Sequence, residues 1–112
     1  MNTIITDTMV ESLQAKGFRR WQKNGKDRLY IDATTLGLSY TRYSTGNISS
    51  AAFHGDSISN AEGRRMLAAK TYIDLVNGTI VSDNATLANA AADLSGLECE
   101  EHRSWDTIIK IA

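Results

Sequence analysis

The dipeptide Asn24-Gly25 constrains the fold of this chain more than any other local feature. Both central residues of a type I′ turn take positive φ, and Asn followed by Gly meets this requirement most readily. The dipeptide lies in the middle of the stretch from Phe18 to Asp32. The sequence therefore predicts a β-hairpin over this range, closed by a two-residue loop.

The predicted turn also fixes which residues face each other across the hairpin. The expected pairs are Lys23 with Lys26, Trp21 with Arg28, and Arg19 with Tyr30. Because successive side chains of a strand point to opposite faces, one face is expected to hold Phe18, Arg20, Leu29 and Ile31, with Gln22 and Asp27 near the turn. The other face, called the basic-aromatic face below, is expected to hold Arg19, Trp21, Lys23, Lys26, Arg28 and Tyr30.

Short capped segments are predicted on both sides of this hairpin. Residues 7–16 form an amphipathic pattern that predicts a helix, capped by Asp7 or by Thr6 and ended by Gly17. Residues 32–37 predict a capped turn or a single helical turn that begins at Asp32 and ends at Gly37.

A second hairpin is predicted from residues 38–43 and 48–53, around the loop Thr45-Gly46-Asn47. The loop is either Thr45-Gly46 or Gly46-Asn47. Both choices place the same residues together on each face of the hairpin, so the assignment of faces does not depend on the choice. The face expected to join the core holds Leu38, Tyr40, Ala51 and Phe53.

The C-terminal half is predicted to be mainly helical. A capping box, Ser59 to Glu62, opens an apolar stripe that predicts a helix over residues 59–76, ended by Asn77-Gly78. A further helix is expected from Ser82 or Asp83 to Gly96. Two alternatives stay open for residues 97–112, because the residues around Ile109 alternate like a strand, while Ser104 is also suited to cap a helical turn.

These elements predict an α+β fold in a single domain, residues 1–112. We expect an antiparallel sheet of about four strands, formed by the two consecutive hairpins. The N-terminal helix and two C-terminal helices are expected to pack mainly on one face of that sheet, which leaves the other face at least partly open.

The residues that carry chemistry are sparse. The chain has one cysteine, Cys99, and two histidines, His54 and His102, too few for a structural zinc site. It shows no glycine loop that would cradle phosphate and no nucleophile elbow. We therefore expect no enzymatic activity, no metal and no cofactor. The lone cysteine, the lack of a signal-like N-terminus and the lack of a long apolar run indicate a cytoplasmic protein without a membrane partner.

The strongest candidate site is the basic-aromatic face. Lys16 to Arg28 contains six of the chain's 12 basic residues and one acid, although the formal net charge is -1. Such a face fits a polyanionic macromolecule, either a protein or a ribonucleoprotein, and Tyr43 is expected to extend it from the second hairpin. A small protein of this kind would act by occlusion or tethering, as inhibitors from bacteriophages and mobile elements often do. The alternative is direct DNA or RNA binding, with rings stacking on bases and cations reaching phosphates.

A purely structural reading is equally open at this stage. Lys and Arg stems shield aromatic rings from water on many proteins. The acidic segment from Glu98 to Asp106 is also suited to cover the basic-aromatic face, either within one chain or between the two chains of a homodimer. Which alternative holds depends on where that segment lies.

Overall fold

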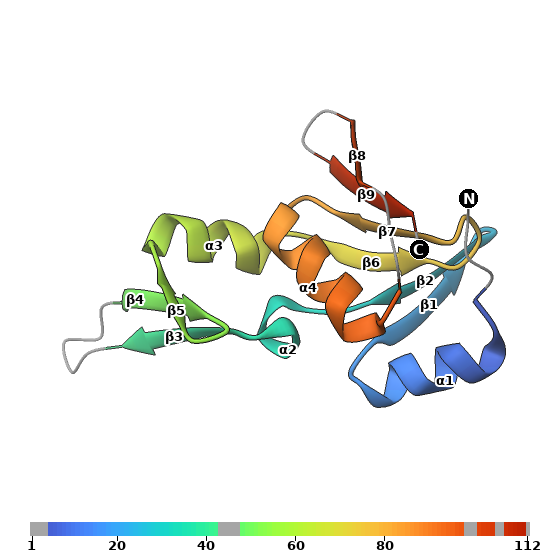
Figure 1. Cartoon of the computed structure of the whole chain (residues 1–112), viewed down its shortest axis with the longest axis horizontal. Coiled ribbons are helices and arrows are strands. Elements are labelled where there is room, and N and C mark those ends of the chain that lie inside the picture. The colour runs from blue at the N-terminus through green and yellow to red at the C-terminus, as the bar shows by residue number, and fades with distance from the viewer. Residues whose placement is uncertain (1–4, 43–47, 98–100, 105–106, 112) are drawn as a thin grey trace.

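The computed structural model describes residues 5–42, 48–97, 101–104 and 107–111, without the side chains of residues 41–42, 48–49, 101–104 and 107–111. The predicted α+β class is confirmed, with antiparallel strands and helices near both ends of the chain (Figure 1). None of the helices in the described part is long and apolar enough to cross a membrane. The elements are α1 (Asp7–Ala15), β1 (Arg19–Lys23), β2 (Lys26–Tyr30), α2 (Ala33–Leu36), β3 (Leu38–Arg42), β4 (Ile48–Phe53), β5 (Asp56–Ile58), α3 (Asn60–Ala68), β6 (Thr71–Asp74), β7 (Thr79–Ser82), α4 (Ala85–Ser95), β8 (Glu101–Ser104) and β9 (Thr107–Ile111).

The first hairpin forms as predicted. Asn24 and Gly25 have φ of 53° and 77°, the positive values that a type I′ turn needs. The register pairs Lys23 with Lys26 and Trp21 with Arg28, so the predicted assignment of faces is confirmed.

This hairpin is one end of a larger sheet. Six antiparallel strands lie in the order β1-β2-β6-β7-β9-β8. Leu29, Ile73 and Ile80 lie side by side on three of these strands and are fully buried. Helix α4 packs against β6, β7 and β9, and its buried residues complete this layer of the core.

Helices α1 and α4 form where the sequence analysis predicted them. Helix α1 is capped by Thr6, whose hydroxyl accepts a hydrogen bond from the Met9 N–H, and it buries Val10 and Leu13. Helix α4 ends at Gly96, as predicted, although its cap is Asn84 and not Ser82 or Asp83. Asp32 also caps α2 as predicted, and Gly37 ends it with a φ of 119°.

The expectation that the two hairpins share one sheet is wrong. Strands β3 and β4 pair with β5 in a separate three-stranded sheet, which lies with α3 at one end of the molecule (Figure 1). The reason is that β6 occupies the free edge of β2, and α2 leads the chain away from it. The predicted inward face of the second hairpin does join the core, since Leu38, Ala51 and Phe53 are buried.

The helix predicted over residues 59–76 is wrong in its second half. Helix α3 begins after Ser59 as expected but ends at Ala68, and residues 71–74 form β6. The run Thr71-Tyr72-Ile73 consists of strong strand formers, and β2 and β7 supply the hydrogen-bonding partners. The dipeptide Asn77-Gly78 then lies in the β6–β7 turn and does not end a helix.

The two alternatives for the C-terminal segment are also decided. Residues 107–111 form β9 beside β7, which confirms the strand alternative. Residues 101–104 form β8, the edge strand at the opposite side of the sheet from β1. Residues 101–104, the middle of the acidic segment, therefore have a defined place in the main sheet.

Gly63 allows α3 to approach the second sheet. A Cβ atom at this position would lie 2.7 Å from both the Ala51 Cβ and the Tyr40 hydroxyl oxygen, closer than side chains normally approach. Since Ala51 is buried, it has little room to move away. A side chain larger than glycine at this position would therefore force α3 or its neighbours on the sheet to shift.

We expect Gly63→Ala to destabilise the protein by about 1–3 kcal/mol, because overpacking outweighs the gain in helix propensity. Urea unfolding followed by circular dichroism measures this change. Arg64→Ala, at the adjacent exposed position, is the control and should lie within about 0.5 kcal/mol of wild type. A stabilised Gly63→Ala variant would contradict the close approach.

Candidate binding surface

The basic-aromatic face lies on the side of β1 and β2 opposite to buried Leu29. Trp21 is 40% exposed, a high value for so large an apolar side chain. Tyr43 lies outside the described residues. Because the second hairpin belongs to another sheet, it does not extend this face along the strands.

Arg28 is the centre of the face. Its guanidinium carbon lies 4.4 Å from the centre of the Tyr72 ring and 6.0 Å from that of Trp21, both within cation–π range. Its Nη1 donates a 2.9 Å hydrogen bond to the Tyr30 hydroxyl. Arg28 thus holds three aromatic rings together, and its own position is fixed by them.

The rings also contact each other. Tyr30 and Tyr72 have ring centres 5.0 Å apart, and Trp21 meets Tyr30 edge-on at 6.4 Å. Burial raises the pKa of the Tyr72 phenol, with Arg28 acting in the opposite direction, so the ring stays neutral at physiological pH. The cluster is therefore a rigid, half-buried platform that presents Trp21 at its outer side.

Sequence reasoning missed Tyr72 because it placed this residue in a helix. The sequence feature that would have identified Tyr72 is the strand-forming run Thr71-Tyr72-Ile73, which a turn follows after Asp74.

Asp74 closes that turn by accepting hydrogen bonds from the backbone N–H groups of Val76 and Asn77. Its carboxylate is thus engaged in the turn, although Asp74 lies opposite Arg28 in the register.

Three further cations surround this cluster. Arg19, Lys23 and Lys26 are exposed, and within the described part of the chain none of them has an ion pair. Lys23 lies directly opposite Lys26, an arrangement of like charges that is unfavourable unless an anion lies nearby. The face therefore carries three exposed cations that make no close ion pair within the described residues, although the Asp32 carboxylate is near enough to Arg19 for an electrostatic interaction.

Arg20 behaves differently because it lies on the other face. Its Nε and Nη2 donate hydrogen bonds of 3.0 and 2.8 Å to the two carboxylate oxygens of Asp27. The sequence placed both residues on this face, and the structure pairs them. The guanidinium of Arg20 lowers the pKa of the Asp27 carboxyl, chiefly through this hydrogen bond.

The described acidic strand does not cover the basic-aromatic face. Strand β8 is separated from β2 by four interstrand steps, which amount to about 19 Å at the usual spacing. Residues 101–104 therefore lie at the far edge of the sheet, while 98–100 and 105–106 are outside the described residues. Helix α4 packs on the other, buried side of the main sheet, while α3 packs on the second sheet, and Trp21 remains exposed.

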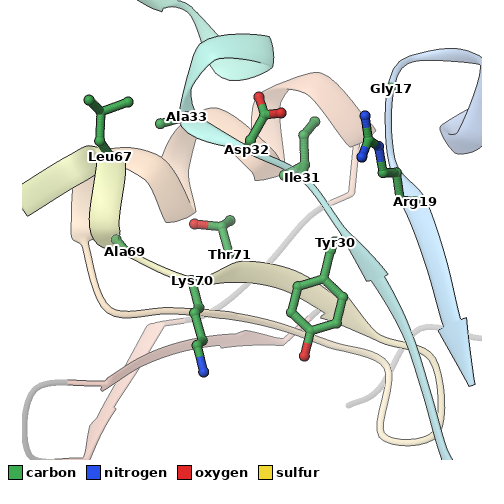
Figure 2. A pocket seen from close by; sticks show the side chains of 10 residues that line it. All are labelled: Gly17, Arg19, Tyr30, Ile31, Asp32, Ala33, Leu67, Ala69, Lys70 and Thr71. Atoms are coloured by element: carbon green, nitrogen blue, oxygen red, sulfur yellow. The ribbon is translucent and has the colours of Figure 1, made fainter. Parts of the chain in front are cut away.

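A pocket of about 300 Å³ lies next to this face, where β2 leads into α2 (Figure 2). Arg19 and Tyr30 belong to both the pocket and the basic-aromatic face, and Lys70 adds a cation beside the tyrosine. Asp32, also at the rim, accepts a 2.7 Å hydrogen bond from the Thr35 N–H, which lowers the pKa of its carboxyl. The full lining is Gly17, Arg19, Tyr30, Ile31, Asp32, Ala33, Leu67, Ala69, Lys70 and Thr71.

The described residues contain no group of three or more His, Cys, Asp or Glu side chains that would hold a metal ion. His54 is exposed in the turn between β4 and β5, where its ring meets Phe53 edge-on.

No protein-family model, no curated protein and no solved structure matches this chain.

Arg28→Lys should destabilise the protein by about 1 kcal/mol, because lysine loses the planar stacking and the bond to the Tyr30 hydroxyl. Urea unfolding measures the difference. Lys26→Arg, on the same strand and face, is the matched control and should leave stability unchanged within about 0.5 kcal/mol. Equal effects of the two substitutions would mean that the aromatic cluster does not hold Arg28.

Asp27→Asn should reduce stability near neutral pH, with a difference from wild type that closes in acid. The folded-state pKa of Asp27 is lowered, so its contribution is present above the unfolded-state pKa and is lost as pH falls through the folded-state pKa. Urea unfolding of both proteins across this range measures the difference. A difference that persists below both pKa values would contradict an ionic origin.

Proposed function

We propose that this protein is a non-enzymatic binding protein that holds a polyanionic partner surface through its basic-aromatic face. The observation that carries the proposal is the set of three exposed cations, Arg19, Lys23 and Lys26, around exposed Trp21. An anionic partner would offset the repulsion between Lys23 and Lys26, and Trp21 would supply apolar contact area. Burial of such an aromatic anchor often dominates the affinity of a protein interface.

The mode of action that fits this surface is occlusion or tethering of the partner, as an inhibitor would do. We place the protein in the cytoplasm, where its lone cysteine would remain reduced. A ribonucleoprotein would be bound through its protein or its phosphate groups by the same cations. A second copy of the chain is a further candidate partner, since acids are concentrated in the C-terminal half of the sequence.

The alternative function is direct binding of DNA or RNA. It is supported by three rings and several cations on one face of an antiparallel sheet, a combination on which single-stranded nucleic acids stack. However, Tyr30 and Tyr72 are half-buried and stacked on Arg28 and on each other. Only Trp21 is well exposed for stacking, and this favours a protein surface over a run of unstacked bases.

The test is a pull-down from a lysate of the host cell with the tagged Lys23→Glu/Lys26→Glu variant. Because the two residues lie opposite each other, the substitution reverses their charge and leaves one like-charged pair in the hairpin, as in wild type. Arg64→Glu/Arg65→Glu is the control with the same change of net charge on α3. The experiment is run with and without nuclease.

We expect the hairpin variant to lose partners that wild type and the α3 variant retain, with no effect of nuclease. Loss of those partners on nuclease treatment would favour the nucleic-acid alternative. In that case affinity for a single-stranded oligonucleotide should fall steeply with salt, with a slope of about −0.7 per phosphate neutralised. Identical partners for all three proteins would overturn the proposal.

A further inference from the structure

Within the described residues, no strand pairs with the outer edge of the main sheet at β1, next to the basic-aromatic face. Strand β1 is the terminal strand of the six, and all five of its residues are exposed. An open edge strand presents unpaired backbone N–H and C=O groups, onto which an extended segment of another chain can pair.

The hydrogen bonds of β2 show which backbone groups of β1 are free. The Leu75 N–H donates to the Asp27 carbonyl at 2.8 Å, and the Ile31 N–H donates to the Thr71 carbonyl at 3.1 Å. The odd-numbered residues of β2 therefore bond toward β6. Since backbone groups alternate in direction along a strand, the even-numbered residues bond toward β1.

The register then assigns the two sides of β1. The even-numbered residues of β2 lie opposite Arg19, Trp21 and Lys23, so these three bond inward to β2. The backbone N–H and C=O groups of Arg20 and Gln22 consequently point away from the sheet. Within the described residues, no loop or helix supplies a backbone hydrogen bond to either of them.

The side chains along this edge define the partner that fits it. A strand added beside β1 would have residues directly opposite Arg19, Trp21 and Lys23, on the same face. Acidic residues are favoured opposite the two cations, and an apolar residue is favoured opposite Trp21. An antiparallel pair of two β1 strands centred on Trp21 would instead place Arg19 opposite Lys23 of the other copy, which like charge disfavours.

We infer that β1 receives an extended acidic segment of a partner protein as an additional strand, with the pattern acid–x–apolar–x–acid. The inference rests on the proposed function and specifies how the polyanionic partner is held. Backbone hydrogen bonds to Arg20 and Gln22 supply the pairing. The side chains of Arg19, Lys23 and Trp21 determine which partner sequences bind.

The probe for this inference is a capped synthetic peptide with the core Glu-Thr-Val-Thr-Glu. Paired antiparallel to β1 in this register, its two threonines lie opposite Arg20 and Gln22 and exchange backbone hydrogen bonds with them, and its valine lies opposite Trp21. Calorimetry measures the affinity, and amide hydrogen exchange by NMR measures protection. We expect protection of the Arg20 and Gln22 N–H groups on binding, and a loss of affinity of about tenfold or more when both glutamates are replaced by lysine.

N-methylation of the peptide separates strand pairing from attraction by charge alone. Methylation of both threonines removes the N–H groups that bond to β1 and should weaken binding by about tenfold or more. Methylation of the valine and the second glutamate changes N–H groups that point away from β1 and should leave affinity nearly unchanged. The protein itself is unaltered in these measurements, so folding does not complicate the comparison.

Equal effects of the two methylation patterns, or binding without protection of Arg20 and Gln22, would overturn the inference. So would protection of both amides before peptide is added, together with a dimer in analytical ultracentrifugation, because a second copy would then occupy the edge. If the peptide fails but heparin binds and Lys23→Glu/Lys26→Glu abolishes that binding, the inference fails and the proposed function stands; binding of a single-stranded oligonucleotide in place of heparin would favour the nucleic-acid alternative. If neither the peptide nor any polyanion binds, both fail.

Discussion

The two-residue alternation along β2 is the constraint on which the rest of the structure depends. Leu29 points to the core, where it meets Ile73 on the neighbouring strand with no exposed surface. The residues on either side of it, Arg28 and Tyr30, must then point outward. A slip of one residue would bury the guanidinium and expose the leucine, so the apolar core fixes the charged face. The Asn24-Gly25 turn sets this register, and β6 reinforces it from the other side.

The same strand explains why the cations of the hairpin fall into three groups. Arg20, on the inner face, is paired with Asp27 and serves the hairpin itself. Arg28 is held by aromatic rings and gives the outer face its shape. Arg19, Lys23 and Lys26 remain exposed around this arrangement. The basic residues that are clustered in the sequence thus have two roles in the structure. Arg20 and Arg28 stabilise the hairpin and its outer face, whereas Arg19, Lys23 and Lys26 remain exposed to solvent.

Local signals predicted much of this arrangement, and non-local pairing accounts for what they missed. The hairpin, its register, α1, α2 and α4 each depend on a cap, a turn or a short pattern, all of which are visible in sequence. The stripe from Met66 to Ile73 fits a helix, and only the presence of β2 and β7 makes its second half a strand. Tyr72 was missed as a member of the site for this reason. The separate second sheet has the same cause, because the edge it was expected to use belongs to β6.

Positive charge on the open edge at β1 has two physical consequences that agree with each other. Charged side chains on an edge strand prevent pairing between identical copies, which protects a soluble protein from aggregation. In the proposed function they would also select for a partner strand of opposite charge, because the residues that repel a second β1 would attract an acidic segment. If the edge strand had only to prevent aggregation, a short polar side chain would be favoured in the middle of β1. Trp21 occupies that position and is exposed, held edge-on by Tyr30 and near the guanidinium of Arg28. A large aromatic ring held in place on a charged edge strand is therefore better explained by the proposed binding of a partner strand than by protection from aggregation alone.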